Sequence, residues 1–87
     1  MKAKIYKGRE VVGTVSFEDS KLTYDVKDQN ELKKLKDIFE KPHETMETED
    51  AEKFMIKPIT LEPKTERHFE VVCSELWKFG YGHEWES

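Results

Sequence analysis

Residues 65–85 read TERHFEVVCSELWKFGYGHEW, and this stretch carries the strongest fold signal in the chain. Apolar residues recur in it at the i, i+3, i+4, i+7 and i+8 spacing that places side chains on one stripe of a helix. These residues are Phe69, Val72, Cys73, Leu76 and Trp77. Gly80 follows them, where glycine can adopt the left-handed conformation that ends a helix. The stretch therefore predicts an amphipathic helix that packs its stripe against the rest of the domain.

The two ends of this helix leave alternatives open. At its start, either Pro63 is the first helical residue or Thr65 caps the helix, and the sequence supports both readings. Beyond Gly80 the chain continues as residues 81–85, YGHEW, in which aromatic residues alternate with glycine and glutamate. This alternation is compatible with a fifth short strand at 81–85 that closes the sheet.

Three short runs at the beginning of the chain alternate apolar and polar residues, which is the pattern of half-buried strands. They cover residues 2–7, 11–17 and 21–26. The side chains expected to face inward are Ala3, Ile5, Val11, Gly13, Val15, Phe17, Leu22, Tyr24 and Val26. Gly13 within the second run predicts a bulge or a place where a helix comes close. The reversals at 8–10 and 18–20 are too short for parallel crossovers, so the runs predict an antiparallel meander.

A second amphipathic helix is expected after the meander. Asp28 can accept hydrogen bonds from free backbone N–H groups, and Glu31 follows three positions later, as in a capping box. An apolar stripe then appears at helical spacing, and residues 33–37 carry its charged face. The stripe consists of Leu32, Leu35, Ile38 and Phe39. Lys41 and Pro42 end this helix.

The middle of the chain is less regular. Residues 43–52, HETMETEDAE, are rich in acids and have no periodic apolar set, so they predict a solvated loop. Residues 53–61 predict a strand whose apolar residues change phase near Lys57 and Pro58. A bulge at this point would return them to one face, because proline is tolerated in sheets only at edges or bulges.

These segments together predict an α+β fold in one domain that spans residues 1–87. The element order is β-β-β-α-β-α with a possible short fifth strand, and both helices pack on one face of a mainly antiparallel sheet. A chain of 87 residues buries only about 60–65% of the surface that its unfolded form exposes. One hydrophobic core is therefore expected.

Composition narrows the class of protein. Hydrophobic residues make up 36% and charged residues 39% of the chain, which is typical of a polar but folded domain. The net charge is −4, and the acid is concentrated in residues 44–87, an imbalance that disfavours general nucleic-acid binding. No apolar run reaches the length of a membrane span, and residues 1–10 lack the apolar core of a secretory signal. With Cys73 as the lone cysteine, a reduced thiol and a cytoplasmic location are expected.

The sequence predicts no catalytic, cofactor or metal site. His43, His68 and His83 are far apart in the sequence and lack ligands at zinc-site spacing, and the acidic segment lacks the pattern of a calcium loop. Cys73 and Ser74 are the candidate nucleophiles, and neither has a base at known spacing. The four glycines form neither a P-loop nor a dinucleotide-binding loop.

Two surfaces remain as functional candidates. The first is a partner-binding surface made of Phe79, Tyr81, His83 and Trp85, because tryptophan and tyrosine are enriched at protein interfaces. The favoured alternative places these residues in the core or in a closing strand, since a small domain needs its aromatics internally. The second is a nucleic-acid face built on Lys2, Lys4 and Tyr6, although single-strand binders normally offer two or more aromatics.

The leading hypothesis is a small accessory protein without catalysis, which binds another protein. A nucleic-acid-binding domain that uses the Lys2, Lys4 and Tyr6 face is the alternative, and a small hydrolase or isomerase is the second alternative. Membrane association is not expected. Unprotected sheet edges also make a homodimer through a sheet edge conceivable.

Overall fold

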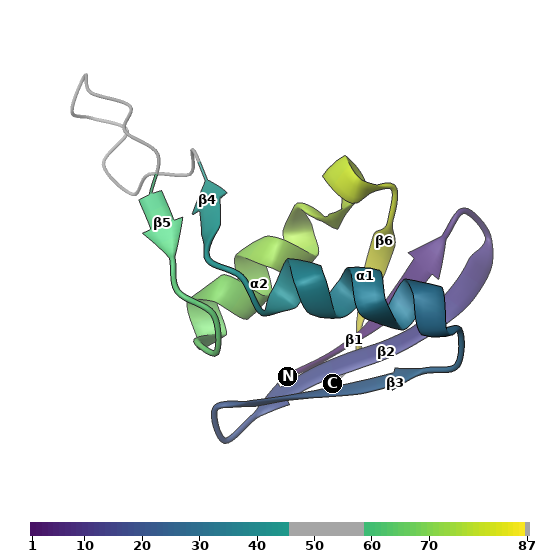
Figure 1. Cartoon of the computed structure of the whole chain (residues 1–87), viewed down its shortest axis with the longest axis horizontal. Helices are drawn as coiled ribbons and strands as arrows, with labels where there is room; N and C mark the ends of the chain where they lie inside the picture. Colours follow the sequence, from purple (N-terminus) through teal and green to yellow (C-terminus); the bar gives the residue numbers. More distant parts are fainter. Residues whose placement is uncertain (46–58, 87) are drawn as a thin grey trace.

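The computed structural model describes residues 1–45 and 59–86, and it confirms the predicted α+β class. Six strands, two α-helices and one short 3₁₀ helix make up these residues (Figure 1). The strands are β1 (Lys2–Lys7), β2 (Glu10–Glu18), β3 (Lys21–Val26), β4 (His43–Thr45), β5 (Ile59–Leu61) and β6 (Gly82–Glu86). The helices are α1 (Gln29–Phe39), α2 (Glu66–Ser74) and the 3₁₀ helix η1 (Leu76–Phe79).

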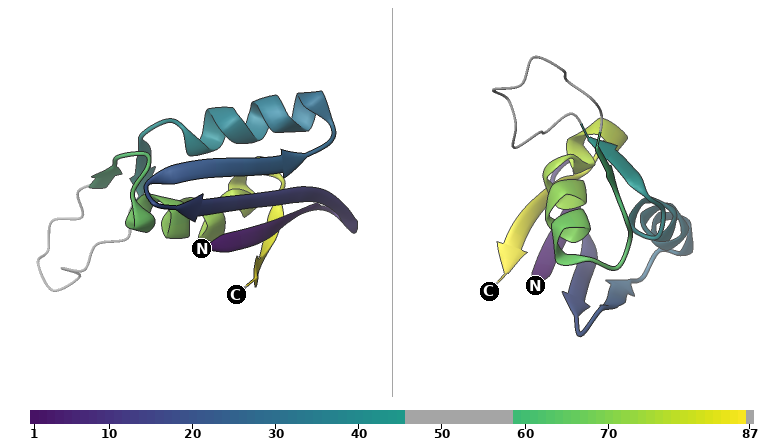
Figure 2. Two further views of the ribbon diagram at one scale, coloured as in Figure 1. Left: turned by 90° about the horizontal axis from the view of Figure 1, so that it is seen from below. Right: turned by 90° about the vertical axis from the view of Figure 1, so that its left-hand side faces the viewer.

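The main sheet is antiparallel and has the strand order β3-β2-β1-β6. Both helices cover the same face of it (Figure 2). The predicted meander of three strands is present, and the predicted closing strand at 81–85 is β6. Because β6 pairs with β1, the first and last strands of the chain are neighbours in the sheet.

The predicted bulge lies in β2, opposite the end of β1. Ile5 pairs with Gly13 and Tyr6 pairs with Val11, so Val12 is the extra residue on the bulged strand. The prediction that Val11 faces inward was wrong: Val11 shares the outer face with Tyr6 and is 57% exposed. Val12 packs against the core instead, because the bulge shifts the alternation of β2 by one residue.

Position 13 requires glycine because a neighbouring strand approaches it closely. The alternative prediction, that a helix comes close here, was wrong. A Cβ atom at this position would lie 2.2 Å from the backbone oxygen of Asp25 in β3. Any larger residue would therefore push β2 and β3 apart next to the bulge.

Helix α1 begins where the sequence predicted. The side-chain Oδ1 of Asp28 accepts hydrogen bonds from the backbone N–H groups of Asn30 and Glu31 at 2.8 and 3.1 Å. Two of the free donors at the helix start are satisfied in this way. Leu35 and Phe39 are buried on the face that α1 turns to the sheet.

Strands β4 and β5 form a separate two-stranded antiparallel sheet, in which His43 pairs with Leu61 and Thr45 pairs with Ile59. The solvated loop predicted from His43 onward was therefore wrong at residues 43–45, where Thr45 is buried. Three residues are too short a run to show alternation, and only the pairing with β5 makes them a strand. The predicted bulge near Lys57 and Pro58, and the rest of the predicted loop, lie outside the described residues.

Helix α2 is capped by Thr65, whose Oγ1 accepts from the His68 N–H at 3.2 Å, so the capping reading of the sequence was right. The α-helix ends at Ser74, and the chain continues as η1 to Gly80, which has a left-handed φ of 87°. A 3₁₀ helix turns about 120° per residue against 100° for an α-helix, so the stripe predicted through Trp77 does not hold beyond Leu76. The prediction that Trp77 belongs to the core was wrong, because its side chain is 69% exposed.

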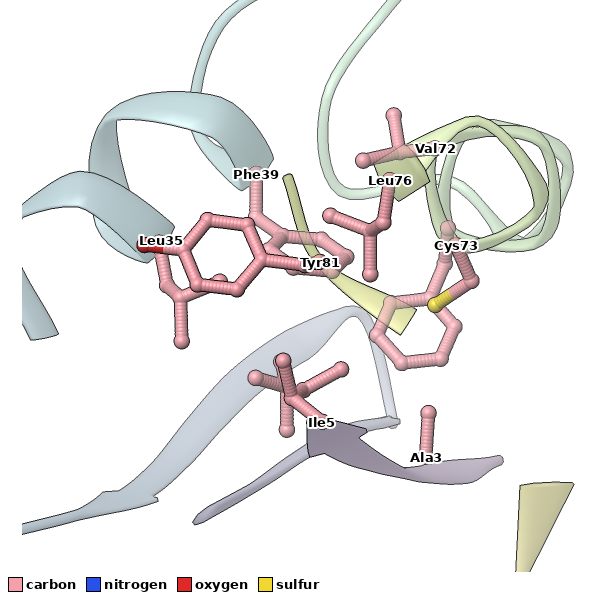
Figure 3. Close-up of a cluster of buried hydrophobic side chains, with 10 residues drawn as sticks. Ala3, Ile5, Leu35, Phe39, Val72, Cys73, Leu76 and Tyr81 are labelled. Carbon is pink, nitrogen blue, oxygen red and sulfur yellow. The ribbon is translucent and has the colours of Figure 1, made fainter. Parts of the chain in front are cut away.

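One hydrophobic core lies between the sheet and the two helices (Figure 3). Strands β1 and β2, both helices, η1 and the residue before β6 contribute to it. Its buried members are Ala3, Ile5, Val15, Leu35, Phe39, Phe69, Val72, Cys73, Leu76 and Tyr81. Among the described residues, no helix is long and apolar enough to cross a membrane.

Candidate functional site

Two exposed aromatic side chains lie in η1, a short turn that we call the aromatic turn (residues 76–79). Trp77 is 69% exposed and Phe79 is 50% exposed, while Leu76, the first residue of the turn, is fully buried. The ammonium group of Lys78 lies 5.7 Å from the centre of the Trp77 ring, within the range of a cation–π contact. The aromatic turn thus presents two rings and one cation to solvent.

Backbone hydrogen bonds hold the aromatic turn in place. The Gly80 N–H donates to the Trp77 carbonyl, and the Tyr81 N–H donates to the Leu76 carbonyl, each at 3.1 Å. The second bond needs the left-handed conformation of Gly80, which a residue with a Cβ adopts only at a cost. The two exposed rings therefore stand on a backbone of defined shape.

A buried carboxylate anchors the same turn to the β4–β5 sheet. Glu75 accepts from the Lys78 ammonium group, and the Nε2 of His43 in β4 lies 3.2 Å from its Oε2. Burial raises the pKa of the Glu75 carboxyl, but hydrogen bonds from Lys78, Thr45 and His43 outweigh burial and lower the pKa below its ordinary value. Glu75 is therefore ionised at neutral pH and links the aromatic turn to β4.

The structure brings two of the predicted histidines together. The rings of His43 and His68 are perpendicular, with their centres 6.4 Å apart. The Nε2 of His68 lies 2.7 Å from the Lys41 carbonyl oxygen and donates a hydrogen bond to it, and burial lowers the pKa of this imidazole. Within residues 1–45 and 59–86, no group of three or more His, Cys, Asp or Glu side chains could hold a metal ion. The histidine pair thus has the geometry of a structural contact.

The four residues predicted as a partner-binding surface are divided by the fold. Phe79 is exposed, as the surface reading requires, but Tyr81 is only 4% exposed and belongs to the core. His83 and Trp85 lie on the inner face of β6, opposite Ile5 and Ala3. Trp85 packs against the Phe69 ring at 5.9 Å and remains 45% exposed. The alternative of strand closure thus describes residues 81–85, and Tyr81 cannot belong to an exposed interface.

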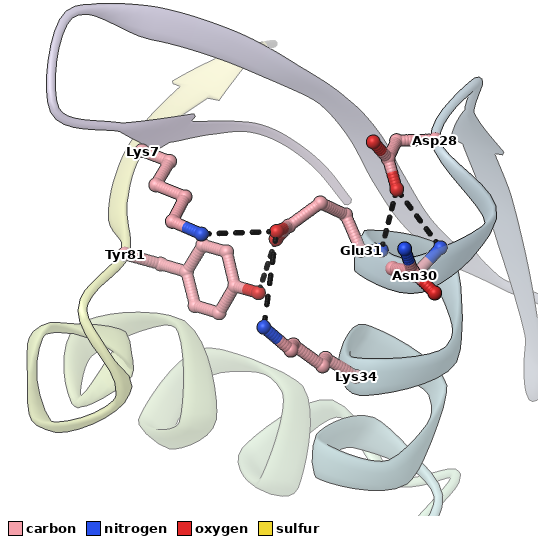
Figure 4. A network of polar contacts seen from close by, with 6 residues as sticks. All are labelled: Lys7, Asp28, Asn30, Glu31, Lys34 and Tyr81. Carbon is pink, nitrogen blue, oxygen red and sulfur yellow. Dashed lines mark hydrogen bonds and ion pairs between the residues drawn. The ribbon is translucent and has the colours of Figure 1, made fainter.

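Tyr81 is held by a polar network at the start of α1 (Figure 4). Its hydroxyl donates to Oε2 of Glu31, and the Lys7 ammonium group donates to the other carboxylate oxygen at 3.1 Å. Burial, followed by the contact with Glu31, raises the pKa of Tyr81 to about 12. The hydrogen bonds from Tyr81 and then Lys7 lower the pKa of Glu31. The side chain expected to complete a capping box therefore connects α1 to the core and to β1.

The outer face of the sheet carries the predicted nucleic-acid residues Lys2, Lys4 and Tyr6 side by side on β1. Strand β6 places two glutamates beside them. The ammonium groups of Lys2 and Lys4 lie 3.7 and 3.5 Å from the Glu86 carboxylate. The Tyr6 hydroxyl donates to Glu84 at 2.7 Å. These acids offset the positive charge that phosphate binding would need.

The two candidate nucleophiles are engaged elsewhere. Cys73 is fully buried in the core, and burial raises the pKa of its thiol to about 12. Such a thiol holds its proton at neutral pH and is a poor nucleophile. The Ser74 hydroxyl donates to the Val71 carbonyl within its own helix at 2.8 Å. Neither group is available for covalent catalysis in this arrangement.

A hollow of about 660 Å³ lies next to the bulge in β2. Its titratable lining consists of carboxylates and lysines, among them Lys7, Glu10, Asp25 and Glu31. Glu31 is already bound to Lys7 and Tyr81, so it is not free to act as an acid or base on a ligand. The hollow therefore offers no obvious pairing of nucleophile and base.

Comparison of the chain with protein-family models, with curated proteins and with solved structures found no match. Sequence reasoning missed Trp77, because helical spacing placed it in the core, and it missed the contact between His43 and Glu75. Gly80 correctly predicted where this segment ends, but it does not reveal that the last turn is a 3₁₀ helix that leaves Trp77 exposed.

Proposed function

We propose that this chain is a cytoplasmic, non-catalytic accessory domain that binds a partner protein through the aromatic turn. The observation that supports this proposal is the exposure of Trp77 and Phe79 on a turn whose backbone is hydrogen-bonded at both ends. Tryptophan is among the residues that contribute most binding free energy at protein interfaces.

Two properties of the aromatic turn favour binding of a partner. Burying a large apolar side chain against a partner contributes about 1.5–3 kcal/mol, so two exposed rings offer a substantial gain on binding. The contacts of Gly80 and Glu75 already fix the turn, which reduces the entropy lost on association. Rings that remain in water add little to the stability of the domain itself, whereas a partner surface that buries both rings gains binding free energy.

The two alternatives have less support. A nucleic-acid partner would meet Lys2 and Lys4 already paired with Glu86, next to a single aromatic, Tyr6. A hydrolase or isomerase would need a nucleophile or base other than Cys73, whose thiol is buried. Both therefore rank below protein binding.

The test is a quantitative affinity capture from cells of the source organism. The variant carries Trp77→Ala and Phe79→Ala together, and the matched control carries Val11→Ala, an exposed apolar residue on the opposite face of the sheet. We expect partner proteins that the wild-type chain and the control retain and that the double variant loses. Circular dichroism should show that all three proteins are equally folded.

The result that would contradict the proposal is equally specific. If the double variant captures the same proteins in the same amounts as the wild type, the aromatic turn does not bind them. If it unfolds under conditions in which the control is folded, the two rings are structural.

A further inference from the structure

Strand β6 forms one edge of the main sheet, and β3 forms the other. At the other edge, α1 lies along β3, and the ammonium group of Lys36 sits 5.7 Å from the Tyr24 ring centre. No described helix lies outside β6 (Figure 2). An open edge presents unpaired backbone N–H and C=O groups, which can pair with another extended chain.

The two sides of β6 differ in chemistry. Glu84 and Glu86 point to the outer face, in register with Lys4 and Lys2 of β1. His83 and Trp85 point to the inner face, and their rings contact each other edge to face with centres 5.4 Å apart. Beside Trp85 lies a hollow of about 330 Å³, which Met1 and Val71 line together with the polar residues Arg67, Glu70 and Ser74.

A second copy of β6 meets like charges at this edge in two antiparallel registers. Antiparallel pairing of two copies centred on Glu84 would place the two Glu84 side chains directly opposite each other. Centring the pair on Trp85 would place Glu84 of each copy opposite Glu86 of the other. Like charges in directly opposed positions destabilise a strand pair. The edge therefore favours a partner strand with basic side chains.

We propose that β6 docks an extended segment of another protein in which basic and apolar residues alternate. The segment adds to the sheet as a fifth strand. Its basic side chains lie beside Glu84 and Glu86 on the outer face, so that lysines of β1 and of the segment flank the glutamates. Its apolar side chains lie on the inner face, next to Trp85 and above the hollow.

This arrangement follows from the period of a strand. Successive side chains of an added strand point to opposite faces, so one face of the segment meets only the glutamates and the other meets only the aromatic side. Glu84 is exposed and the Glu86 side chain is 33% exposed, so both remain accessible from the edge. Trp85, at 45% exposure, has free ring surface for an apolar side chain to cover.

The test uses a fluorescently labelled nine-residue peptide that alternates lysine and valine, with a glutamate and valine peptide of the same length as the reference. Binding is measured by fluorescence anisotropy, and amide hydrogen exchange locates the bound peptide. We expect the lysine peptide to bind the wild-type chain and to slow the exchange of amides in β6. The glutamate peptide should not bind.

Two matched double variants distinguish binding at the β6 edge from a general attraction between the acidic protein and the basic peptide. Glu84→Gln with Glu86→Gln keeps side-chain shape and the hydrogen bond from Tyr6, and it should weaken binding of the lysine peptide about tenfold. Glu18→Gln with Asp25→Asn removes the same charge from β2 and β3 and should change binding less than about twofold. Absence of binding, protection outside β6, or an equal loss in both variants would overturn the proposal. The edge and the aromatic turn carry different substitutions, so either proposal can fail alone.

Discussion

Replacing Tyr81 with alanine should remove a large part of the stability of this domain. The side chain is 4% exposed, sits among core residues of both helices and donates its hydroxyl hydrogen to Glu31. Truncating a buried aromatic to alanine costs about 3–5 kcal/mol, because a cavity replaces the ring. A domain of 87 residues is stable by about 4–13 kcal/mol, so this single change approaches the lower limit.

Tyr81→Phe separates the ring from the hydroxyl. The phenylalanine fills the same space, and Glu31 keeps its hydrogen bond from Lys7. We expect a loss of about 1–2 kcal/mol, near the lower end for a hydrogen bond to a charged group. This loss corresponds to a fall in melting temperature of about 4–15 °C for a domain of this size.

The assay is urea unfolding followed by circular dichroism at 222 nm, which does not depend on the tryptophan residues. Trp77→Ala is the matched control, because it removes a larger ring that is 69% exposed and should shift stability by no more than about 0.5 kcal/mol. A Tyr81→Ala variant as stable as the wild type, or a Trp77→Ala variant as unstable as Tyr81→Ala, would refute the assignment of core and surface rings.

Three further predictions concern other parts of the fold. The Cys73 thiol, with its pKa raised to about 12 by burial, should not react with a disulfide reagent at neutral pH until urea unfolds the chain; fast reaction of the native protein would contradict its burial. Gly13→Ala should destabilise the domain by more than about 2 kcal/mol in urea unfolding, since its Cβ would meet the Asp25 oxygen, whereas Gly82→Ala should have little effect because its nearest neighbour is 3.9 Å away. Burial lowers the pKa of His68 in the folded state, so the unfolded chain binds a proton at higher pH; stability should fall as pH drops below about 6.5, and His68→Gln should flatten that fall in unfolding curves measured from pH 7.5 to 5.5.

The parts of the fold that the sequence predicts depend on neighbouring residues. The meander of β1, β2 and β3 and the Asp28 cap of α1 follow from alternation, short reversals and a side chain that bonds its own helix start. The Thr65 cap and the stop at Gly80 belong to the same class. Each of these signals lies within a few residues, so the sequence alone contains it.

The features that the sequence does not predict need contacts between distant segments. Strand β5 lies within the strand predicted at residues 53–61, but β4, which pairs with it, has too few residues to show a period. The contact between His43 and Glu75 joins residues 32 positions apart. The exposure of Trp77 follows from a change of helix type after Ser74, which apolar spacing does not reveal. The candidate surface therefore became visible only in three dimensions.

The pairing of β1 with β6 has a consequence for how the chain acquires its shape. The β1–β2 and β2–β3 hairpins pair neighbouring segments, whereas the hydrogen bond from Tyr6 to Glu84 joins residues 78 positions apart. Closing so long a loop costs more chain entropy than closing a hairpin. Before β6 pairs, β1 is an edge strand whose unpaired backbone groups are open to other chains. Once β6 is in place, the edge strand carries Glu84 and Glu86, and charged side chains on an edge strand disfavour pairing between like chains.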